Sequence, residues 1–273
     1  LCTSGLEAAP AYEIKSHGYN IIDSMSGKVK FSAPLEDIPS ILNNFRTVDR
    51  ILIKVGEFYS NNFDDLFDKV YNLNWAEYVE KNGRLVVEKV KITNSDLSAT
   101  GAVASIIKKA IYEKLKSSYK CTIWEENEVI YPIYVYLKDN VVTVALDTVY
   151  KESLAKRGYR TQHVSTSLRE TIAASMVLLS KWEAKYTLID PFCGSGTIPI
   201  EAALYASGKS LKKEYVCEKW RIFNEFRHSF YPYFEPEEIN YRIYGYDKSY
   251  KAISIAKENA SLANVKIHFE KKA

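Results

Sequence analysis

The spacing of apolar and polar residues predicts a small α+β region over residues 1–58. Gly5, Leu6 and Glu7 open a predicted helix that runs through His17, and Gly18 then ends it as a C-cap would. The patterns further along predict a strand at 29–31, a second helix at 35–45 and a strand at 50–55.

A second α+β region is predicted over residues 59–150. Helices are expected over 62–71 and 102–115, where apolar side chains recur every three or four residues and so share one face. Strand-like runs rich in Val, Ile and Tyr stand at 85–87, 90–92, 130–137 and 141–146. Residues 138–140 join the last two runs, which predicts a tight β-hairpin at that point.

Helix and strand patterns then alternate from residue 166 to residue 273, after a connecting segment over 151–165. The predicted order is a helix ending near 182, a strand at 186–189, a helix at 199–206, a strand at 243–246, a helix at 251–262 and a strand at 265–269. This alternation is typical of a parallel α/β sheet. Residues 207–240 interrupt it, and we interpret them as an insertion.

The aromatic residues of the insertion allow two interpretations. Trp220, Phe223 and Phe226 stand among lysines and arginines, a composition that suits stacking of unpaired RNA bases. The same spacing suits an insertion that packs onto the sheet. We favour packing for the rings and leave RNA contact open for the lysines.

Positive charge is concentrated in one part of a chain whose net charge is only +3. Residues 81–120 hold nine lysines and arginines against three acidic residues. Such a patch attracts phosphate backbones, although a solvated helix face has the same composition. Lys89, Lys91, Lys108 and Lys109 are therefore candidates for RNA contact.

Several classes of protein are disfavoured by what the sequence lacks. The four cysteines include no pair at CxxC spacing and the four histidines share no metal-ligand spacing, so we expect neither a disulfide framework nor a metal site. No apolar run approaches the roughly 18–20 residues that span a bilayer, and no secretory signal opens the chain. We expect a cytoplasmic protein without membrane contact. The chain opens on Leu1, which is compatible with a start inside a longer reading frame.

The strongest chemical signal is the segment Asp190-Pro-Phe-Cys-Gly-Ser-Gly196 between a predicted strand and a predicted helix. Gly194 and Gly196 allow the backbone to approach a ligand, and the next helix presents its N-terminus there. The third glycine of a dinucleotide-binding GxGxxG motif is replaced by Pro199, which disfavours a nicotinamide-dependent oxidoreductase. S-adenosylmethionine fits better, because Asp190 can attract its positive charges. The alternative is a turn with a purely structural role.

A second acid follows the next predicted strand, in Ile243-Tyr-Gly-Tyr-Asp247. A carboxylate at this place is positioned to accept hydrogen bonds from ribose hydroxyls. Asp190 and Asp247 lie 57 residues apart, whereas about 20 residues separate the two positions in a bare βαβ unit, which supports the inserted segment. An ordinary surface aspartate is the alternative.

Several motifs in order resemble one family. The segment 190–203, Asp-Pro-Phe-Cys-Gly-Ser-Gly-Thr-Ile-Pro-Ile-Glu-Ala-Ala, resembles the signature of class I methyltransferases that carry an N-terminal THUMP domain and modify RNA, some of them first labelled N6-adenine-specific DNA methylases. Further resemblances are Cys2–Glu7 to the family's opening segment, 103–111 to its THUMP region, 154–160 to its linker, 168–171 to the helix before the sheet and 218–220 to a marker in its insertion. The resemblance covers nearly the whole chain.

The resemblance implies a fold class of α/β plus α+β, with three domains and a linker. These are a ferredoxin-like domain (1–58), a THUMP RNA-binding domain (59–150), a linker (151–165) and the N-terminal portion of a Rossmann-like class I methyltransferase domain (166–273). The implied activity is transfer of a methyl group from S-adenosylmethionine to guanine N2 in large-subunit ribosomal RNA, with structured RNA as partner. The oligomeric state is left open.

The family's pattern also assigns residues. The cofactor-binding set expected from it is Asp190, Phe192, Cys193, Gly194, Ser195, Gly196 and Asp247. Arg157 and Arg160 in the linker motif could contact RNA or the cofactor, and they join the four lysines as candidates for RNA contact.

Two departures from the family stand out. Ser167 replaces the proline that usually precedes the Leu-Arg-Glu-Thr segment. The family's catalytic motif Asn/Asp-Pro-Pro-Tyr is missing, since the chain contains no Pro-Pro and ends at Ala273, about where the segment leading to that motif would begin. In the family this motif holds the amine of a flipped base. We therefore expect no catalytic residue in this chain, no activity of the chain alone, and a truncated or proteolysed product or a further C-terminal segment.

Three other functions remain as alternatives: an RNA-binding module without activity, a methyltransferase acting on guanine N2 of transfer RNA, and a methyltransferase acting on adenine N6 of DNA. The THUMP-like region argues against the last of these.

Overall fold

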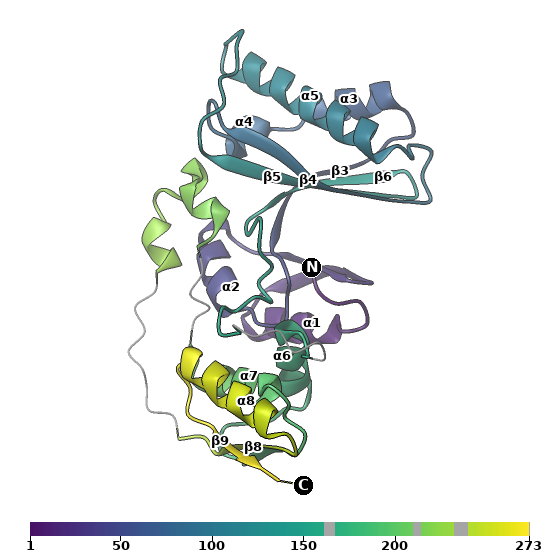
Figure 1. Cartoon of the computed structure of the whole chain (residues 1–273). Helices are drawn as coiled ribbons and strands as arrows, with labels where there is room; N and C mark the ends of the chain where they lie inside the picture. Colours follow the sequence, from purple (N-terminus) through teal and green to yellow (C-terminus); the bar gives the residue numbers. More distant parts are fainter. Residues whose placement is uncertain (161–166, 210–213, 232–239, 273) are drawn as a thin grey trace. The chain divides into compact units, whose positions relative to one another are not determined.

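The computed structural model describes residues 1–160, 167–209, 214–231 and 240–272 (Figure 1). The chain folds into two compact units, each built from segments that are not consecutive in the sequence. Unit 1 consists of Leu1–Asp49, Glu152–Lys213 and His228–Ala273, and unit 2 consists of Arg50–Lys151 and Glu214–Arg227.

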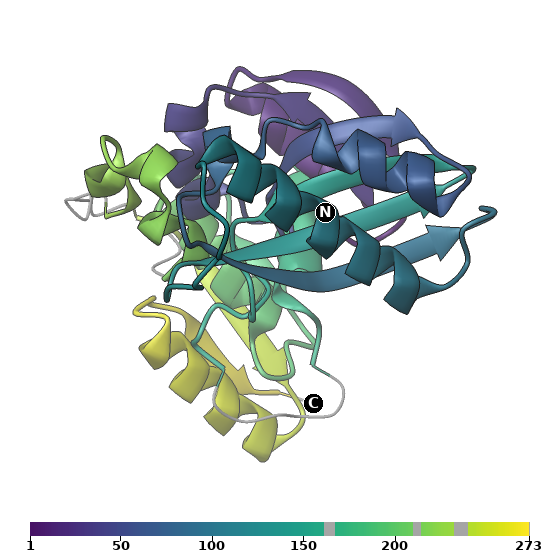
Figure 2. The same cartoon turned by 90° about the horizontal axis from the view of Figure 1, so that it is seen from above.

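Unit 2 is built on a four-stranded sheet with the order β3-β6-β5-β4. Its elements are β3 (Leu52–Tyr59), α3 (Phe63–Tyr71), α4 (Trp75–Tyr78), β4 (Arg84–Thr93), α5 (Thr100–Ser118), β5 (Ile130–Lys138), β6 (Val141–Asp147), η2 (Val216–Lys219) and η3 (Arg221–Phe223). The strands β5 and β6 form the predicted hairpin, in which Asp139 and Asn140 both have positive φ, as a two-residue type I′ turn requires. Helices α3 and α5 lie side by side on one face of the sheet (Figures 1 and 2).

The core of unit 2 lies between these two helices and the sheet. The helices contribute Leu66 and Val70 from α3, and Val103, Ile107, Ala110, Ile111 and Leu115 from α5. Their spacing of three and four residues places them on one helical face, as the sequence pattern predicts. Among the residues predicted to point inward, Ile106 is only partly buried.

Two strand predictions for this region are wrong in detail. The runs at 85–87 and 90–92 form one strand, β4, with a register shift between Val87 and Lys89. The strand expected at 50–55 to complete the N-terminal α+β region is β3, which instead pairs antiparallel with β6 of the four-stranded sheet. Strand partners depend on contacts distant in sequence, which a local pattern does not contain.

Residues 214–227 of the insertion belong to unit 2, whereas its described residues on either side belong to unit 1. The Trp220 ring is fully buried and stacks on Tyr131 of β5, with ring centroids 5.0 Å apart. Its indole Nε1 donates a hydrogen bond of 2.8 Å to the carbonyl of Ile130. The predicted packing role of the rings is confirmed for Trp220 and for the fully buried Phe223, but they pack on unit 2 and not on the parallel sheet. Residues 210–213 and 232–239 of the insertion lie outside the described residues.

Unit 1 combines the N-terminal region with the parallel sheet. Its elements are α1 (Ala8–Ser16), β1 (Asn20–Met25), β2 (Lys28–Ser32), η1 (Leu35–Asp37), α2 (Ile38–Asn44), α6 (Glu170–Leu179), β7 (Leu188–Asp190), α7 (Thr197–Ala206), β8 (Ile243–Asp247), α8 (Tyr250–Leu262) and β9 (His268–Lys271); the helical turn η4 (Arg227–Phe230) starts one residue before this unit resumes. The strands β7, β8 and β9 are parallel and stand in that order, which confirms the predicted parallel sheet.

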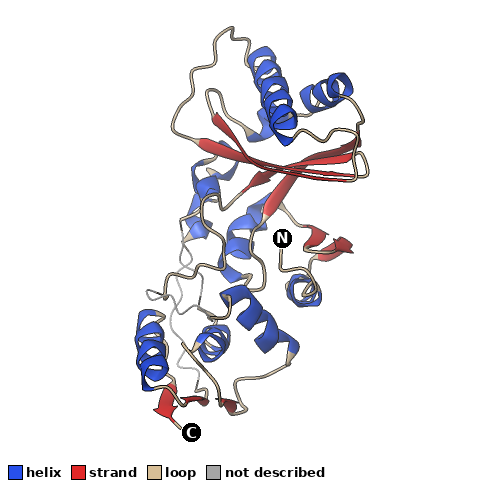
Figure 3. Cartoon of the chain, turned by 45° about the vertical axis from the view of Figure 1, so that its right-hand side comes forward, coloured by secondary structure: helices blue, strands red, loops and turns tan. Residues whose placement is uncertain are grey.

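Helices α7 and α8 lie on the same side of this parallel sheet (Figures 1 and 3). Ile200 and Ala203 of α7, Ala256 of α8, and Ile243 and Phe269 of the strands form a buried apolar cluster beneath them.

The sequence pattern did not reveal the strand β1, which pairs antiparallel with β2.

The segment expected as a linker is packed inside unit 1 along the part that the structure describes. Leu154, Ala155 and Tyr159 are all buried, whereas 161–166 lie outside the described residues. None of the helices described is both long enough and apolar enough to cross a membrane.

The position of Trp220 leads to the first prediction. Trp220→Ala should lower the free energy of unfolding of unit 2 by about 3–5 kcal/mol, because the variant leaves a cavity where a fully buried ring is packed. Urea denaturation measures this decrease, and hydrogen exchange should rise in β5. Tyr250→Ala, at a residue that is 76% exposed, serves as control and should change stability by less than about 0.5 kcal/mol. Faster exchange in β8 and β9 with β5 unchanged would contradict the assignment of the insertion to unit 2.

Candidate functional site

The candidate site lies at the carboxyl ends of two neighbouring parallel strands. Asp190 is the last residue of β7 and Asp247 the last residue of β8, and Asp190 pairs in register with Gly245. The carboxyl ends of parallel strands are the usual place for ligands in open α/β sheets. Both predicted acids therefore stand at the same edge, on either side of the turn 190–196.

The turn depends on two glycines that do different things. Gly194 and Gly196 both have positive φ, at 53° and 82°. A Cβ on Gly196 would lie 2.8 Å from the ring of Phe269, so this glycine allows close packing against β9. A Cβ on Gly194 would meet no atom within 4 Å. The side of Gly194 on which a ligand could approach is thus open.

Asp247 holds the turn as well as facing the site. Its Oδ2 accepts a hydrogen bond of 3.1 Å from the backbone N–H of Gly194, and its Oδ1 accepts one of 2.8 Å from Ser249 at the start of α8. A further hydrogen bond of 2.8 Å joins the N–H of Cys193 to the carbonyl of Tyr246. These contacts tie the turn to the end of β8.

Burial raises the pKa of Asp190, and the negative charge of the nearby Asp247 adds to this effect. A hydrogen bond of 3.0 Å from the N–H of Phe192 to Oδ1 acts in the opposite direction. The ionised carboxylate is therefore less favourable here than in water. A positively charged ligand group placed beside it would relieve that cost.

The side chains of the predicted cofactor set divide into two groups. Phe192 is 87% exposed at the tip of the turn, and Asp190, Gly194 and Asp247 are partly exposed. Cys193, Ser195 and Gly196 are buried and frame the turn from behind. Burial, with the charges of the two aspartates, raises the pKa of the Cys193 thiol to about 12. This thiol therefore stays protonated at neutral pH and is a poor nucleophile.

Two residues that the sequence did not assign to the site hold Ser195 in place. Asn259, buried on α8, donates a hydrogen bond of 3.0 Å to the Ser195 carbonyl. Ser167, which departs from the family's proline, places its hydroxyl 3.2 Å from that of Ser195. The departure thus adds a polar contact to the turn, whereas no local pattern around Asn259 could have revealed its contact.

The four candidate lysines do not come together. Lys108 and Lys109 lie on α5, whereas Lys89 and Lys91 lie on β4 in register with Tyr134 and Tyr136. The lysines of β4 alternate with Val90 and Ile92, whose register partners Val135 and Leu137 are buried in the core under the helices. Because side chains alternate between faces along a strand, Lys89 and Lys91 point to the face that α3 and α5 leave uncovered.

Both candidate arginines serve the interior of unit 1. The Arg157 side chain is 2% exposed and forms an ion pair with Glu201, and it also donates to the carbonyls of Leu154 and Arg46. Arg160 forms an ion pair of 2.9 Å with Glu170, and both side chains are largely buried. Their guanidinium groups are occupied by partners in the chain, so the expected RNA contact of these two arginines is wrong for this structure.

Metal ligation has no support among the residues that the structure describes, since no three of their His, Cys, Asp and Glu side chains are placed to hold an ion. A parallel sheet, a glycine turn before a helix and an acid at the end of the next strand are features of a Rossmann-like fold, the fold of class I methyltransferases. Comparisons with known proteins agree. Residues 1–52 match the family described as the RlmL ferredoxin-like domain, 60–147 the THUMP domain and 157–273 the RMKL-like methyltransferase domain.

Relatives match almost the whole chain. "Putative RNA methyltransferase YpsC" of Bacillus subtilis is 35% identical, over 96% of this chain and 69% of that protein. The "tRNA (guanine(6)-N2)-methyltransferase" of Methanocaldococcus jannaschii is 32% identical, over 96% and 71%. "Ribosomal RNA large subunit methyltransferase K/L" of Aliivibrio fischeri is 30% identical, over 97% and 39%. The crystal structure of SMU.472, "a putative methyltransferase complexed with SAH", superposes with a TM-score of 0.87 at 30% identity, over 99% of this chain and 74% of that one.

The chain belongs to the family of THUMP-domain-containing RNA methyltransferases that use S-adenosylmethionine. The predicted ferredoxin-like, THUMP and Rossmann-like folds are confirmed with it.

The two glycines of the turn can be separated by experiment. Gly196→Ala should destabilise unit 1 strongly, because its Cβ meets the Phe269 ring and its φ is positive. Gly194→Ala should cost only about 1–2 kcal/mol of backbone strain but weaken S-adenosylmethionine binding at least tenfold, since its Cβ occupies the open side. Thermal denaturation and calorimetric titration measure the two effects. Unchanged affinity of Gly194→Ala would show that no ligand uses that side.

The raised pKa of Asp190 predicts how stability depends on pH. The folded protein protonates this carboxyl at a higher pH than the unfolded chain does, so stability falls as pH rises through that window. Asp190→Asn keeps the acceptor for the N–H of Phe192 and should raise Tm at pH 7. The advantage should vanish below the ordinary pKa of an aspartate, near 3.8. A lower Tm of the variant at pH 7 would contradict the argument.

Proposed function

We propose that this protein methylates the exocyclic N2 of a guanine in structured RNA, and that the RNA is large-subunit ribosomal RNA. The observation that carries the proposal is the pair of acids, Asp190 and Asp247, at the ends of adjacent parallel strands around an open glycine turn. The match of residues 1–52 to the RlmL ferredoxin-like domain and the ribosomal relative support the choice of RNA.

The residues of the turn fit the cofactor. S-adenosylmethionine supplies a methyl carbon on a positively charged sulfur, and this carbon forms a bond to the amine nitrogen while its bond to sulfur breaks and the amine releases a proton. We assign Asp190 to the positive charges of the cofactor, because its ionised form is disfavoured without a cation. We assign Asp247 to the ribose hydroxyls, Gly194 to close backbone approach and the exposed Phe192 ring to an apolar contact. Cys193, Ser195 and Gly196 hold the turn.

The chain's contribution to methyl transfer is alignment. A bound amine must meet the methyl carbon in line with the carbon–sulfur bond, and fixing that geometry supplies a large part of the rate. The packing of the turn against Phe269 and its hydrogen bonds to Asp247 and Asn259 fix one reactant. We assign no catalytic residue among those described.

The surface of α5 is the proposed RNA contact. Lys108, Lys109 and Lys116 line a groove of about 670 Å³ together with Tyr112 and Trp124. Lysines attract phosphates and aromatic rings stack with unpaired bases, so this combination suits RNA. Lys89 and Lys91 lie on the other face of the sheet and offer a comparison set.

A methyl-transfer assay tests the function. The protein is incubated with labelled S-adenosylmethionine and unmodified 23S ribosomal RNA, transfer RNA or DNA. Label in ribosomal RNA that digests to N2-methylguanosine is the expected result. Label in transfer RNA alone would replace the ribosomal proposal with the activity in the Methanocaldococcus relative's name. Label in DNA alone, or on adenine, would overturn both.

Binding measurements give the cofactor and RNA parts of the test. Calorimetric titration of S-adenosylmethionine should show saturable binding that Asp247→Ala abolishes. Lys108→Ala with Lys109→Ala should weaken RNA binding and lower the salt slope by about one for each phosphate that is no longer neutralised. The matched pair Lys89→Ala with Lys91→Ala should change RNA binding less. The reverse order would move the proposed contact to the open face of the sheet.

A further inference from the structure

A buried carboxylate on α7 has no role in the function described so far. Glu201 is the fifth residue of α7, the helix that begins directly after the turn 190–196, and it is fully buried. A buried charge is costly unless it is paired. The cost of burying a carboxylate therefore indicates that Glu201 has a specific structural role.

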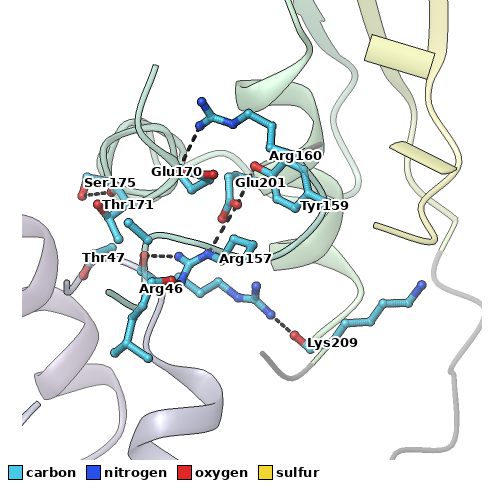
Figure 4. Close-up of polar contacts among 12 residues, drawn as sticks. Arg46, Thr47, Arg157, Tyr159, Arg160, Glu170, Thr171, Ser175, Glu201 and Lys209 are labelled. Carbon is cyan, nitrogen blue, oxygen red and sulfur yellow. Dashed lines mark hydrogen bonds and ion pairs between the residues drawn. The ribbon is translucent and has the colours of Figure 1, made fainter. Parts of the chain in front are cut away.

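Two partners from one short segment meet this carboxylate (Figure 4). The hydroxyl of Tyr159 donates a hydrogen bond of 3.0 Å to Oε1, and Nε of Arg157 lies 3.5 Å from the same oxygen. Oε2 makes no hydrogen bond among the described residues. All the polar contacts of the Glu201 carboxylate within the described chain thus lead to residues 157–159.

Arg157 in turn joins α7 to the N-terminal region. Its Nη2 donates to the carbonyl of Arg46, which follows α2, and Nη1 donates to Leu154. The Arg46 guanidinium donates to the carbonyl of Lys209, just beyond the end of α7. Burial lowers the pKa of Arg46, and the negative charge of Glu201 counteracts this effect. Glu201 thus supplies negative charge beside two buried guanidinium groups, those of Arg157 and Arg46.

The far end of α7 is the cofactor turn. Glu201 stands five residues after Gly196, about 7.5 Å along the helix axis at 1.5 Å per residue. Because a helix is stiff over this length, a shift of α7 at Glu201 shifts Gly196 and Ser195 with it. Asn259 and Phe269 hold the turn from the side of α8 and β9, and Glu201 holds it through α7.

We infer that Glu201 is a positioning residue for the cofactor turn, which it fixes through Arg157 and Tyr159 to the buried segment 154–160. The inference rests on the proposed binding of S-adenosylmethionine at the turn. In this inference the Arg157-Gly-Tyr-Arg160 segment fixes the position of α7 within unit 1.

The test compares two buried glutamates of unit 1. Glu201→Gln keeps the size of the side chain and an acceptor for Tyr159 but removes the charge that Arg157 needs. Glu13→Gln is the matched control, since Glu13 is also buried and its hydrogen bonds come from the backbone N–H groups of Arg46 and Thr47 and from the Thr47 hydroxyl, none of which belongs to α7. Both variants should lower Tm. Each titration is run well below the Tm of its variant.

Affinity for S-adenosylhomocysteine is the readout that a merely structural role would not move. Glu201→Gln should raise the Kd for S-adenosylhomocysteine at least tenfold and speed hydrogen exchange over 190–200. Glu13→Gln should leave this Kd within twofold of the wild-type value. An unchanged Kd for folded Glu201→Gln would overturn the inference, and so would an equal loss of affinity in Glu13→Gln. If Glu201→Gln does not fold, Tyr159→Phe and Arg157→Lys replace it, with affinity expected to fall about threefold, and unchanged affinity in both overturns the inference.

The same titrations separate this inference from the function beneath it. Wild-type binding that Asp247→Ala abolishes supports the proposed cofactor site whatever Glu201→Gln does. Failure of the folded wild-type protein to bind overturns the proposed site, and the inference about Glu201 falls with it.

Discussion

The close approach of the turn 190–196 to strands β8 and β9 is the constraint on which the rest of the site depends. Phe269 occupies the space that a side chain at Gly196 or Gly245 would need, so only glycines allow the turn to reach the sheet. Once the turn is there, the N–H groups of Cys193 and Gly194 meet acceptors on Tyr246 and Asp247. The same approach brings the second acid near Asp190, and the raised pKa of Asp190 follows from that packing.

The placement of the two carboxylates at this turn lowers the stability of the protein and favours the binding of a cationic ligand. Two carboxylates at one sheet edge repel each other, and burial disfavours the charge of Asp190 further. A cationic ligand removes both costs at once, so the site favours a positive charge and is less stable without one. The Cys193 thiol stays neutral because burial raises its pKa, and the negative charges of the two aspartates add to this effect. Burial beside negative charge therefore raises the pKa values of both Asp190 and Cys193.

Local sequence determined the parts of the fold that are local. The glycine turn, the hairpin at 138–140, the helices and the parallel βαβ order were all predictable, because each depends on residues near in sequence. The partner of β3, the face to which Lys89 points and the packing of Trp220 on Tyr131 depend on contacts 80 or more residues away or on strand register, which no local pattern contains. Of the site, Asp190 and Asp247 were predictable from strand ends, whereas Asn259 acts only because α8 folds back over Ser195.

The structure gives Arg157 and Arg160 a role that their place in the linker motif did not predict. By sequence alone, the place of Arg157 and Arg160 in the linker motif suggests contact with RNA. In the structure each has a carboxylate partner, Glu201 and Glu170, and both partners lie on helices of the cofactor part. Desolvated guanidinium groups with partners in their own chain cannot also bind phosphate without breaking those pairs, which buried ion pairs resist strongly. The charge of these arginines therefore serves contacts within unit 1, where Arg157 joins α7 to the N-terminal region and Arg160 joins the 154–160 segment to α6.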